Sequence, residues 1–365
     1  MAYRAAVTGE RARVVHLVSR PVRRGAQMYA AQLCRALDDG RDHLLVGLFG
    51  PEDASPLPVD MSLDGVRTKL WRRVADPRAA WRLRRLLSDR PAAIIAYGGE
   101  AAVCAAAAFP FGGTALIYRK IGMAGHGPSR LQVWWWRRVM RRFDIVAAVS
   151  DATGEDATSR FGIPPSRLRL LPNARDPEEF HPSPDPPAEP PVRIAFVGSL
   201  NPDKRPGWVI ETVRRLRSAG HDARGLIIGS GPLYEQFRSA DVEGIDLLGS
   251  RDDVAHQLRR AHVLAFPGSP LEGTPGVLIE AGLTGLPVVT TDLPSAREVV
   301  VDGVTGLIVS PDDEDGFHEA IVRLVTNSAE RRRLGAAARN HCAEAFGMPA
   351  AARRWAALLD ELLDG

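Results

Sequence analysis

Short apolar runs alternate with amphipathic stretches along most of the chain. Before residue 182 the apolar runs are RVVHLVS, HLLVGLF, AAIIAY, TALIY and IVAAVS. After residue 191 they are VRIAFVG, RGLIIG, IDLLG, HVLAFP, PVVTT and TGLIVS. Continuous apolar runs of this length are typical of strands that are buried on both faces of a parallel sheet. The stretches between them, such as residues 25–37 and 129–142, have the spacing of helices.

A proline-rich segment divides this pattern into two parts. The stretch HPSPDPPAEPPV, residues 181–192, has six prolines in twelve residues and therefore forms neither a helix nor a central strand. We predict an α/β fold of two doubly wound, Rossmann-like domains, residues 1–182 and 193–348, joined by a linker at residues 183–192. The helical residues 349–365 are expected to pack back on the first domain. In such domains ligands bind at the carboxyl ends of the strands, so we expect a site in a cleft between the domains.

Composition and cysteine content favour a cytoplasmic protein. The chain is 45% hydrophobic and 25% charged, as in soluble globular proteins. Cys34, Cys104 and Cys342 have no metal-ligand or redox spacing and indicate reduced thiols. Residues 1–12 contain no apolar signal core, and the most apolar run, residues 101–109, is too short to span a bilayer. Membrane contact would therefore be peripheral, at the inner face of the membrane.

Charge is distributed unevenly. Residues 1–185 carry 28 of the 47 Lys and Arg but 19 of the 44 Asp and Glu, a net charge of +9, whereas the remainder carries −6. A basic first half suggests an anionic partner, such as a phosphorylated substrate, an acidic polymer or a membrane surface. Solvated arginine-rich helix faces explain it equally well. The run WWWRRVMRR, residues 134–142, could lie on a membrane, although packing of its tryptophans into the core is the favoured interpretation.

The stretch LEGTPGVLIEAG carries the first candidate chemistry. Glu272 and Glu280 stand on either side of a turn, residues 273–276, that enters a crossover helix at the carboxyl end of a strand. The first amides and the dipole of such a helix favour an anion. Eight residues at 1.5 Å rise cover about 12 Å, roughly the distance from a hexose past a diphosphate to a ribose. The alternative is that Glu272 caps the helix and Glu280 is a solvated helix residue.

Two further loops could face a phosphate. In FVGSLNPDKRP a strand ends at Gly198, and Ser199 opens a polar turn that leads to Lys204 and Arg205 before a helix. Two cations at the carboxyl end of a strand suit a diphosphate, although ordinary loop charge remains the alternative. Gly25 opens the helix after the first strand and is a weaker candidate, because no GxGxxG fingerprint surrounds it.

Other polar groups have more ambiguous roles. His126, in GMAGHGPSR, and residues 118–120, YRK, follow the fourth strand and are candidate acceptor-side groups. A structural role is the alternative for each. The acidic run PDDEDG, residues 311–316, is better explained by a helix start than by a metal site. No cluster of His or Cys ligands occurs, so we predict no metal. We also expect no cofactor and no nucleic-acid partner.

Taken in order, these segments resemble the family-4 glycosyltransferases, which have the GT-B fold. The similarity runs from about residue 14 to about residue 363. It is carried by DIVAAVSDAT, RLLPNARDPEEFHP, FVGSLNPDK, LIIGSGP, HVLAFPGSPLEGTPGVLIEAGLTGLPVVTTD and REVVVDGVTGLIV. The E-x7-E element and the order of the set are its most specific parts. The resemblance implies a retaining, sugar-nucleotide-dependent enzyme that requires no metal.

The resemblance also implies roles for individual residues. Glu280 would bind the ribose diol, Lys204 the diphosphate, and Gly25 would approach the diphosphate from the first domain. Glu272 would hold the transferred sugar and the phosphates, together with the backbone of Gly273, Thr274, Pro275, Gly276 and Val277.

The sequence departs from the family pattern at three places. The family often has Arg where Ser199 stands, which would provide a second diphosphate cation; Arg205 is the candidate to compensate. The family's NGVD is NARD here, residues 173–176. A histidine that is common after the fourth strand is absent, and Arg119 or Lys120 occupies its region, which leaves the role of His126 open.

The hypothesis from the sequence is therefore transfer of a sugar from a nucleoside diphosphate sugar to an unidentified glycan, lipid-linked or natural-product acceptor. Glu272, Lys204, Arg205 and His126 are assigned as catalytic, and the two glutamates hold the donor. One alternative is a sugar-nucleotide epimerase or a sugar phosphorylase of the same fold. Another is a non-catalytic subunit that binds sugar nucleotides or glycans.

Overall fold

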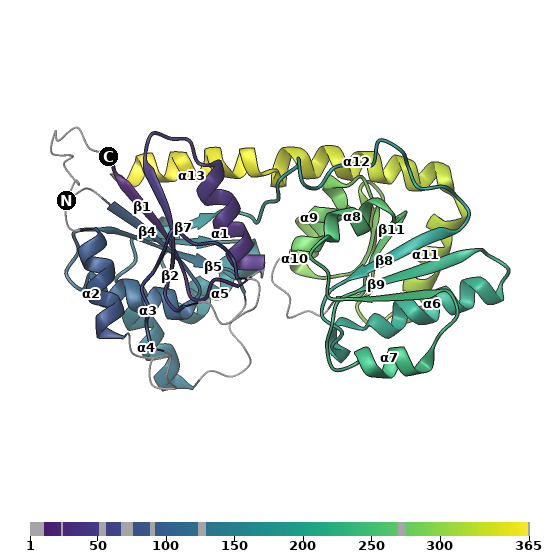
Figure 1. Ribbon diagram of the computed structural model, residues 1–365, viewed down its shortest axis with the longest axis horizontal. Coiled ribbons are helices and arrows are strands. Elements are labelled where there is room, and N and C mark those ends of the chain that lie inside the picture. The colour runs from purple at the N-terminus through teal and green to yellow at the C-terminus, as the bar shows by residue number, and fades with distance from the viewer. Residues whose placement is uncertain are drawn as a thin grey trace. The chain divides into compact units, whose positions relative to one another are not determined.

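The structure is a computed structural model, which describes residues 11–22, 25–50, 56–66, 76–87, 92–122, 129–268 and 275–363. The chain divides into two compact units (Figure 1). Unit 1 comprises Met1–Ala174 and Met348–Gly365, and unit 2 comprises Arg175–Gly347. The sequence predicts that the first domain ends at residue 182. In the structure unit 2 begins at Arg175, so the proline-rich linker, residues 183–192, belongs to unit 2.

Unit 1 is a parallel sheet of seven described strands in the order β3-β2-β1-β4-β5-β6-β7. The strands are β1 (Arg13–Val18), β2 (Asp42–Gly47), β3 (Met61–Ser62), β4 (Ala92–Tyr97), β5 (Ala115–Lys120), β6 (Ile145–Ala148) and β7 (Leu168–Leu170). The helices are α1 (Gly25–Ala36), α2 (Pro77–Leu86), α3 (Gly99–Ala108), α4 (Arg130–Met140), α5 (Asp151–Phe161), the 3-10 helix η1 (Pro165–Arg167) and α13 (Met348–Leu363).

The central strand β4 shows why its sequence has no polar alternation. All six residues of AAIIAY are buried. Ile94 packs in a cluster with residues of α2 and α3, whereas Ile95 packs with residues of α1 and α13. Because successive side chains of a strand point to opposite faces, both faces of this sheet are covered by helices.

Helix α13 belongs to unit 1, as the sequence predicts. Trp355 is fully buried, and its indole Nε1 donates a hydrogen bond to the Tyr29 hydroxyl of α1 at 2.9 Å. Leu358, Leu359 and Leu363 add apolar contacts at helical spacing in the same cluster. The last helix therefore completes one face of the first sheet.

Unit 2 is a parallel sheet of six described strands in the order β10-β9-β8-β11-β12-β13. The strands are β8 (Val192–Val197), β9 (Ala223–Ile228), β10 (Ile245–Gly249), β11 (Val263–Phe266), β12 (Val288–Thr291) and β13 (Gly306–Val309). The helices are the 3-10 helix η2 (Pro202–Lys204), α6 (Pro206–Ser218), α7 (Tyr234–Ala240), α8 (Val254–Arg259), α9 (Gly276–Leu283), α10 (Pro294–Arg297), α11 (Glu314–Thr326) and α12 (Ser328–Phe346).

Each of the eleven apolar runs forms a strand, and the α/β fold with two doubly wound units is confirmed. The sequence does not reveal β3 and β7, which have only two and three residues and lie at the two edges of the first sheet. The acidic run at residues 311–316 begins a helix, as expected: the Asp313 side chain accepts from the Gly316 amide at 2.8 Å and caps α11.

The topology of each sheet creates one switch point. In unit 1 the chain moves in opposite directions from β1, towards β2 and later towards β4; in unit 2 it does so from β8, towards β9 and later towards β11. Loops that leave two such strands diverge and leave a crevice at their carboxyl ends. The loop after β8 and the start of α9 lie next to the switch point of unit 2.

A chain of buried polar side chains crosses the core of unit 1. His16 Nδ1 lies 3.0 Å from the Tyr97 hydroxyl, and its Nε2 lies 3.1 Å from His43 Nδ1. His43 Nε2 lies 2.8 Å from Asp39 Oδ1. Burial, followed by the nearby His43, lowers the pKa of His16 from 6.5 to about 3, whereas Asp39 opposes the shift. His16 is therefore uncharged in the folded chain at neutral and mildly acidic pH.

This burial predicts an acid-dependent loss of stability. Below pH 6.5 the unfolded chain binds a proton at His16 that the folded chain does not bind. The free energy of unfolding should therefore decrease by up to about 1.4 kcal/mol per pH unit between pH 6.5 and 3. Urea unfolding at pH 7, 6 and 5 measures the slope. The His16→Asn variant should lose this contribution, and identical slopes for the two proteins would contradict the prediction.

Candidate functional site

The loop after β8 is held by backbone hydrogen bonds that continue past the strand. The Gly198 amide donates to Ile228 O and the Leu200 amide donates to Ser230 O, each at 3.0 Å. Ser199 lies between these anchors and is exposed. The loop that leads to Lys204 therefore has a fixed start.

Glycines of the neighbouring GSGP turn permit this contact. Gly229 has φ 142°, and a Cβ atom there would lie 1.8 Å from Gly198 O. A Cβ at Gly231 would lie 2.8 Å from the Leu200 backbone. The turn, a weak signal in the sequence, is thus the support on which the β8 loop rests.

The two cations of this loop have different surroundings. Lys204 ends η2 and is partly buried, and this burial lowers its pKa, although Asp203 opposes the shift. Arg205 turns its guanidinium towards another loop, where it donates to Pro311 O and to Asp312 Oδ1, the latter at 3.1 Å. It also stacks on Trp208, 4.8 Å from the ring centre. Arg205 thus connects α6 with the loop after β13. Lys204 is therefore the better candidate to bind a diphosphate.

Helix α9 provides the other side of the candidate site. Pro275, in an extended conformation, precedes Gly276, the first residue of the helix. Val277 is buried in the core, so only its backbone could face a ligand. Glu280 lies one turn further on, and its Oε1 accepts a hydrogen bond from Arg175 Nε at 2.6 Å. The sequence-based interpretation had not assigned Arg175, although its position in NARD was noted as a departure.

The elements next to the switch point of unit 2 carry several of the predicted residues. Gly198, Ser199 and Lys204 come from one side, and Gly276 and Glu280 from the other. A cation, helix amides and a carboxylate in this arrangement can hold a phosphate at one end and a diol at the other. Glu272, Gly273, Thr274 and His126 lie outside the described residues.

In unit 1 the switch point lies between β1 and β4. Gly25, at the start of α1, is exposed, and a Cβ atom there would meet nothing within 4 Å. Gly98 follows β4 with φ 94°, and a Cβ there would approach Ser19 Oγ at 3.9 Å. This second glycine was missed, although the GG pair directly after a strand was its signal.

The charged residues that end β5 have structural roles. Arg119 is fully buried and donates to Leu171 O, Pro172 O and Asn173 Oδ1. Lys120 forms an ion pair with Asp156 at 2.6 Å. Burial lowers the pKa of Lys120, although Asp156 opposes the shift. Both side chains thus hold the β5 end in place.

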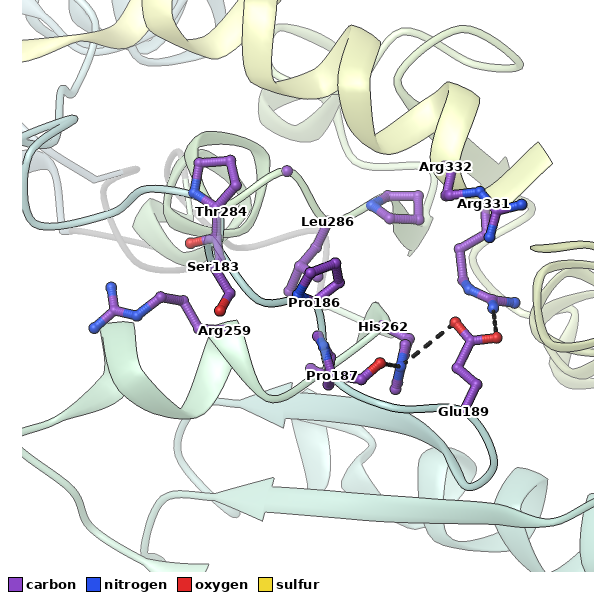
Figure 2. A pocket seen from close by; sticks show the side chains of 14 residues that line it. Ser183, Pro186, Pro187, Glu189, Arg259, His262, Thr284, Leu286, Arg331 and Arg332 are labelled. Atoms are coloured by element: carbon purple, nitrogen blue, oxygen red, sulfur yellow. Dashed lines mark hydrogen bonds and ion pairs between the residues drawn. The ribbon is translucent and has the colours of Figure 1, made fainter. Parts of the chain in front are cut away.

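A pocket of about 560 Å³ lies at the opposite, amino edge of the unit 2 sheet (Figure 2). Glu189 of the proline-rich segment pairs there with Arg331 at 2.5 Å and lies 3.5 Å from His262 Nε2. His262 Nδ1 accepts from the Arg193 amide at 2.9 Å, and Nε2 lies 3.2 Å from Pro187 O. Burial lowers the pKa of His262 and favours the neutral form. These contacts fasten the proline-rich segment to unit 2 at the amino ends of the strands, whereas Lys204 follows the carboxyl end of β8.

Within the part of the chain that the structure describes, no group of three or more His, Cys, Asp or Glu residues could hold a metal ion. Over the same residues, no helix has both the length and the apolar content required to cross a bilayer.

Comparison with known families decides what kind of protein carries this site. A profile described as "Glycosyl transferase 4-like domain" matches residues 24–174, and one described as "Glycosyl transferases group 1" matches residues 191–327. The chain belongs to the glycosyltransferases. The first matched segment of this glycosyltransferase contains β2 to β7, and the second contains β8 to β13 together with the candidate site.

Several proteins are similar in sequence to this glycosyltransferase. Over 320 residues it is 28% identical to a GDP-mannose-dependent alpha-(1-6)-phosphatidylinositol monomannoside mannosyltransferase of Mycolicibacterium smegmatis. This match covers 80% of this chain and 81% of that protein. It is 27% identical over 248 residues to an exopolysaccharide phosphotransferase of Streptomyces coelicolor, but this match covers 65% of the chain and only 26% of the relative.

Solved structures share its fold. Anabaena HepE in complex with UDP superposes with a TM-score of 0.78 at 17% identity, over 96% of this chain and 100% of that chain. Sucrose-phosphate synthase from Thermosynechococcus elongatus gives a TM-score of 0.79 at 18% identity, over 97% and 99%. These similarities confirm the GT-B fold that the sequence resemblance implies.

The Gly229 contact yields a direct test of the loop support. In Gly229→Ala the new methyl group would overlap Gly198 O, so the loops must separate, and we expect a loss of about 2 kcal/mol or more in the free energy of unfolding. Gly207→Ala is the control, because a Cβ at this second residue of α6 would meet nothing within 4 Å. Urea unfolding compares the two variants, and equal stability would contradict the role assigned to Gly229.

Proposed function

We propose that the protein is a retaining glycosyltransferase that uses a nucleoside diphosphate sugar and requires no metal. The observation that supports it is that Lys204, at the end of η2 after β8, and Glu280, in α9, belong to elements next to the switch point of unit 2. Lys204 would contact the diphosphate, and Glu280 the ribose hydroxyls. The relatives named for GDP-mannose and the fold shared with a UDP complex support a nucleotide-sugar donor.

The mechanism follows from the charges that develop on cleavage. Positive charge builds on the sugar and negative charge on the departing diphosphate. Lys204 and the first amides of α9 would stabilise the diphosphate. Glu272 would hold the transferred sugar. The acceptor would attack from the face that the diphosphate leaves, and the diphosphate would take the acceptor proton, so that no protein nucleophile is needed. Arg205 and His126 stay candidate catalytic residues from the sequence, and the contacts of Arg205 favour a supporting role.

The donor and Glu272 can be tested in one assay. UDP-, GDP- and ADP-sugars are screened for nucleotide release with and without glycan, lipid-linked and small-molecule acceptors. Glu272→Ala should abolish acceptor-dependent release, a loss of at least about 100-fold, because the sugar loses a charged hydrogen-bond partner in the transition state. Undiminished turnover would refute the role of Glu272.

The same screen separates the rival functions. Release that needs inorganic phosphate and no acceptor would indicate a phosphorylase, and conversion of the sugar nucleotide without an acceptor would indicate an epimerase. Tight donor binding without release under any acceptor would indicate a binding subunit. Inverted configuration at the anomeric carbon of the product would refute retention, and loss of activity with a chelator would refute metal independence.

We also propose that unit 1 contacts an anionic membrane surface from the cytoplasmic side, through α4. Trp135 and Trp136 pack against the core, as expected, but Trp134 and Leu131 are 63% and 69% exposed. Trp134 lines a groove of about 360 Å³ with Arg137, Arg138 and Arg141. An exposed indole beside cations suits the interface of an anionic bilayer. This arrangement supports a lipid-linked acceptor.

Vesicle binding tests the α4 surface. Trp134→Ala combined with Arg138→Gln should weaken sedimentation with vesicles of anionic phospholipid about tenfold or more, since each lost cation contributes about 1 kcal/mol and the indole adds apolar burial. The control pair is Arg238→Gln with Arg251→Gln, two exposed arginines of unit 2. Equal binding by both double variants would contradict the proposal, as would wild-type binding that is no stronger on anionic than on neutral vesicles.

A further inference from the structure

Arg175 is the first residue of unit 2 and one of its few buried charges. The residue is 8% exposed. Its Nε donates to Glu280 Oε1 at 2.6 Å, and the two paired side chains are 10% and 14% exposed. Its guanidinium also lies directly against the start of α9, because a Cβ atom at Gly276 would be 2.0 Å from Arg175 Nη2. One side chain therefore contacts both Glu280 and the first turn of its helix.

The segment that carries Arg175 is anchored without this side chain. The Arg175 amide donates to Phe346 O at 3.0 Å, and the residue forms a parallel β-bridge with Gly347. These backbone contacts do not depend on the side chain. A buried ion pair is also weak evidence for stability, because desolvation of both groups offsets their attraction. The pair therefore calls for an explanation other than stability.

We propose that Arg175 is a positioning residue for the donor, which holds the Glu280 carboxylate in the orientation that binds the ribose hydroxyls. This inference rests on the proposed function, in which Glu280 contacts the ribose. A glutamate side chain has several freely rotating bonds, and fixing it at the moment of binding reduces affinity. Arg175 fixes it beforehand through one carboxylate oxygen, and the second oxygen can then accept from the ribose.

The contacts of Glu280 agree with one carboxylate oxygen bonding Arg175 and the other being left for the ribose. Among the described residues, the side chain that donates a hydrogen bond to the Glu280 carboxylate is Arg175, which bonds Oε1. Its own helix does not provide another anchor, since the Thr284 hydroxyl donates to the Glu280 backbone carbonyl at 2.8 Å instead. Small residues at the helix start matter too: the contact of the guanidinium with Gly276 leaves no room for a Cβ atom there.

The preference for a ribose over a deoxyribose is the readout. The dissociation constant of the tightest binder among UDP, GDP and ADP is measured beside that of its 2′-deoxy and 3′-deoxy counterparts. We expect the wild-type protein to prefer at least one hydroxyl by about tenfold or more, the effect of a hydrogen bond to a charged group. In Arg175→Met and Glu280→Gln this preference should fall below about threefold, whereas Arg175→Lys should retain an intermediate value.

Arg339→Gln is the matched control. Its guanidinium donates to Phe180 O and to Leu283 O at the other end of α9, at 3.0 and 2.6 Å. The Arg339→Gln substitution therefore removes one positive charge from unit 2 and leaves the contacts of Glu280 unchanged. The ribose preference of this variant should stay at the wild-type value. Thermal unfolding of every variant verifies folding, and Arg175→Lys provides the test if Arg175→Met does not fold.

Failure of this inference and failure of the proposed function give different results. A wild-type preference in folded Arg175→Met would overturn the positioning role alone. An equal loss of affinity for ribose and deoxyribose nucleotides would also overturn it, because Arg175 would then act on the diphosphate. A wild-type protein that binds none of the three nucleotides would overturn the proposed function and this inference together.

Discussion

Close contact between two backbone segments governs the shape of the candidate site. The turn after β9 lies against the loop after β8 so tightly that Gly229 has no space for a side chain. Backbone hydrogen bonds between the two loops extend the sheet beyond its last regular pair. Lys204 is therefore presented from a rigid support, and a rigid support lowers the loss of freedom when a charged group binds a ligand. The uncharged, exposed Ser199 contributes no charge to this loop. Binding of a diphosphate would therefore depend on Lys204 and on the first amides of α9.

The second half of the site depends on charge that is distributed along α9. The helix begins after Pro275, which needs no amide partner, and Gly276 allows a guanidinium to lie against its first turn. Arg175 thus limits the motion of the Glu280 carboxylate before a ligand binds. The GSGP turn has the same effect on the loop that carries Lys204. Arg205 has a third role, because its contacts with Pro311 and Asp312 hold neighbouring loops together.

Much of the fold could be predicted from the sequence, because strands buried on both faces have a distinct pattern. Edge strands β3 and β7 lack it, since two or three partly exposed residues cannot show a period. The site was predicted from residue types at strand ends and from a family resemblance. Neither source could reveal Arg175, because it lies 105 positions from Glu280 and only tertiary packing brings the two together. Arg119 and Lys120 likewise had the composition of functional residues, and their burial shows that they serve the scaffold.

The assignment of α13 to unit 1 has a consequence for synthesis on the ribosome. Unit 2 is a continuous segment, Arg175–Gly347, whereas unit 1 needs residues from both ends of the chain. When residue 347 has been added, every strand of both sheets exists, but Tyr29 still lacks the indole of Trp355. The part of that face on which α13 packs must therefore remain uncovered while the entire second unit is made. Unit 1, although its strands are synthesised before unit 2, thus completes its native packing after the residues of unit 2 have been made.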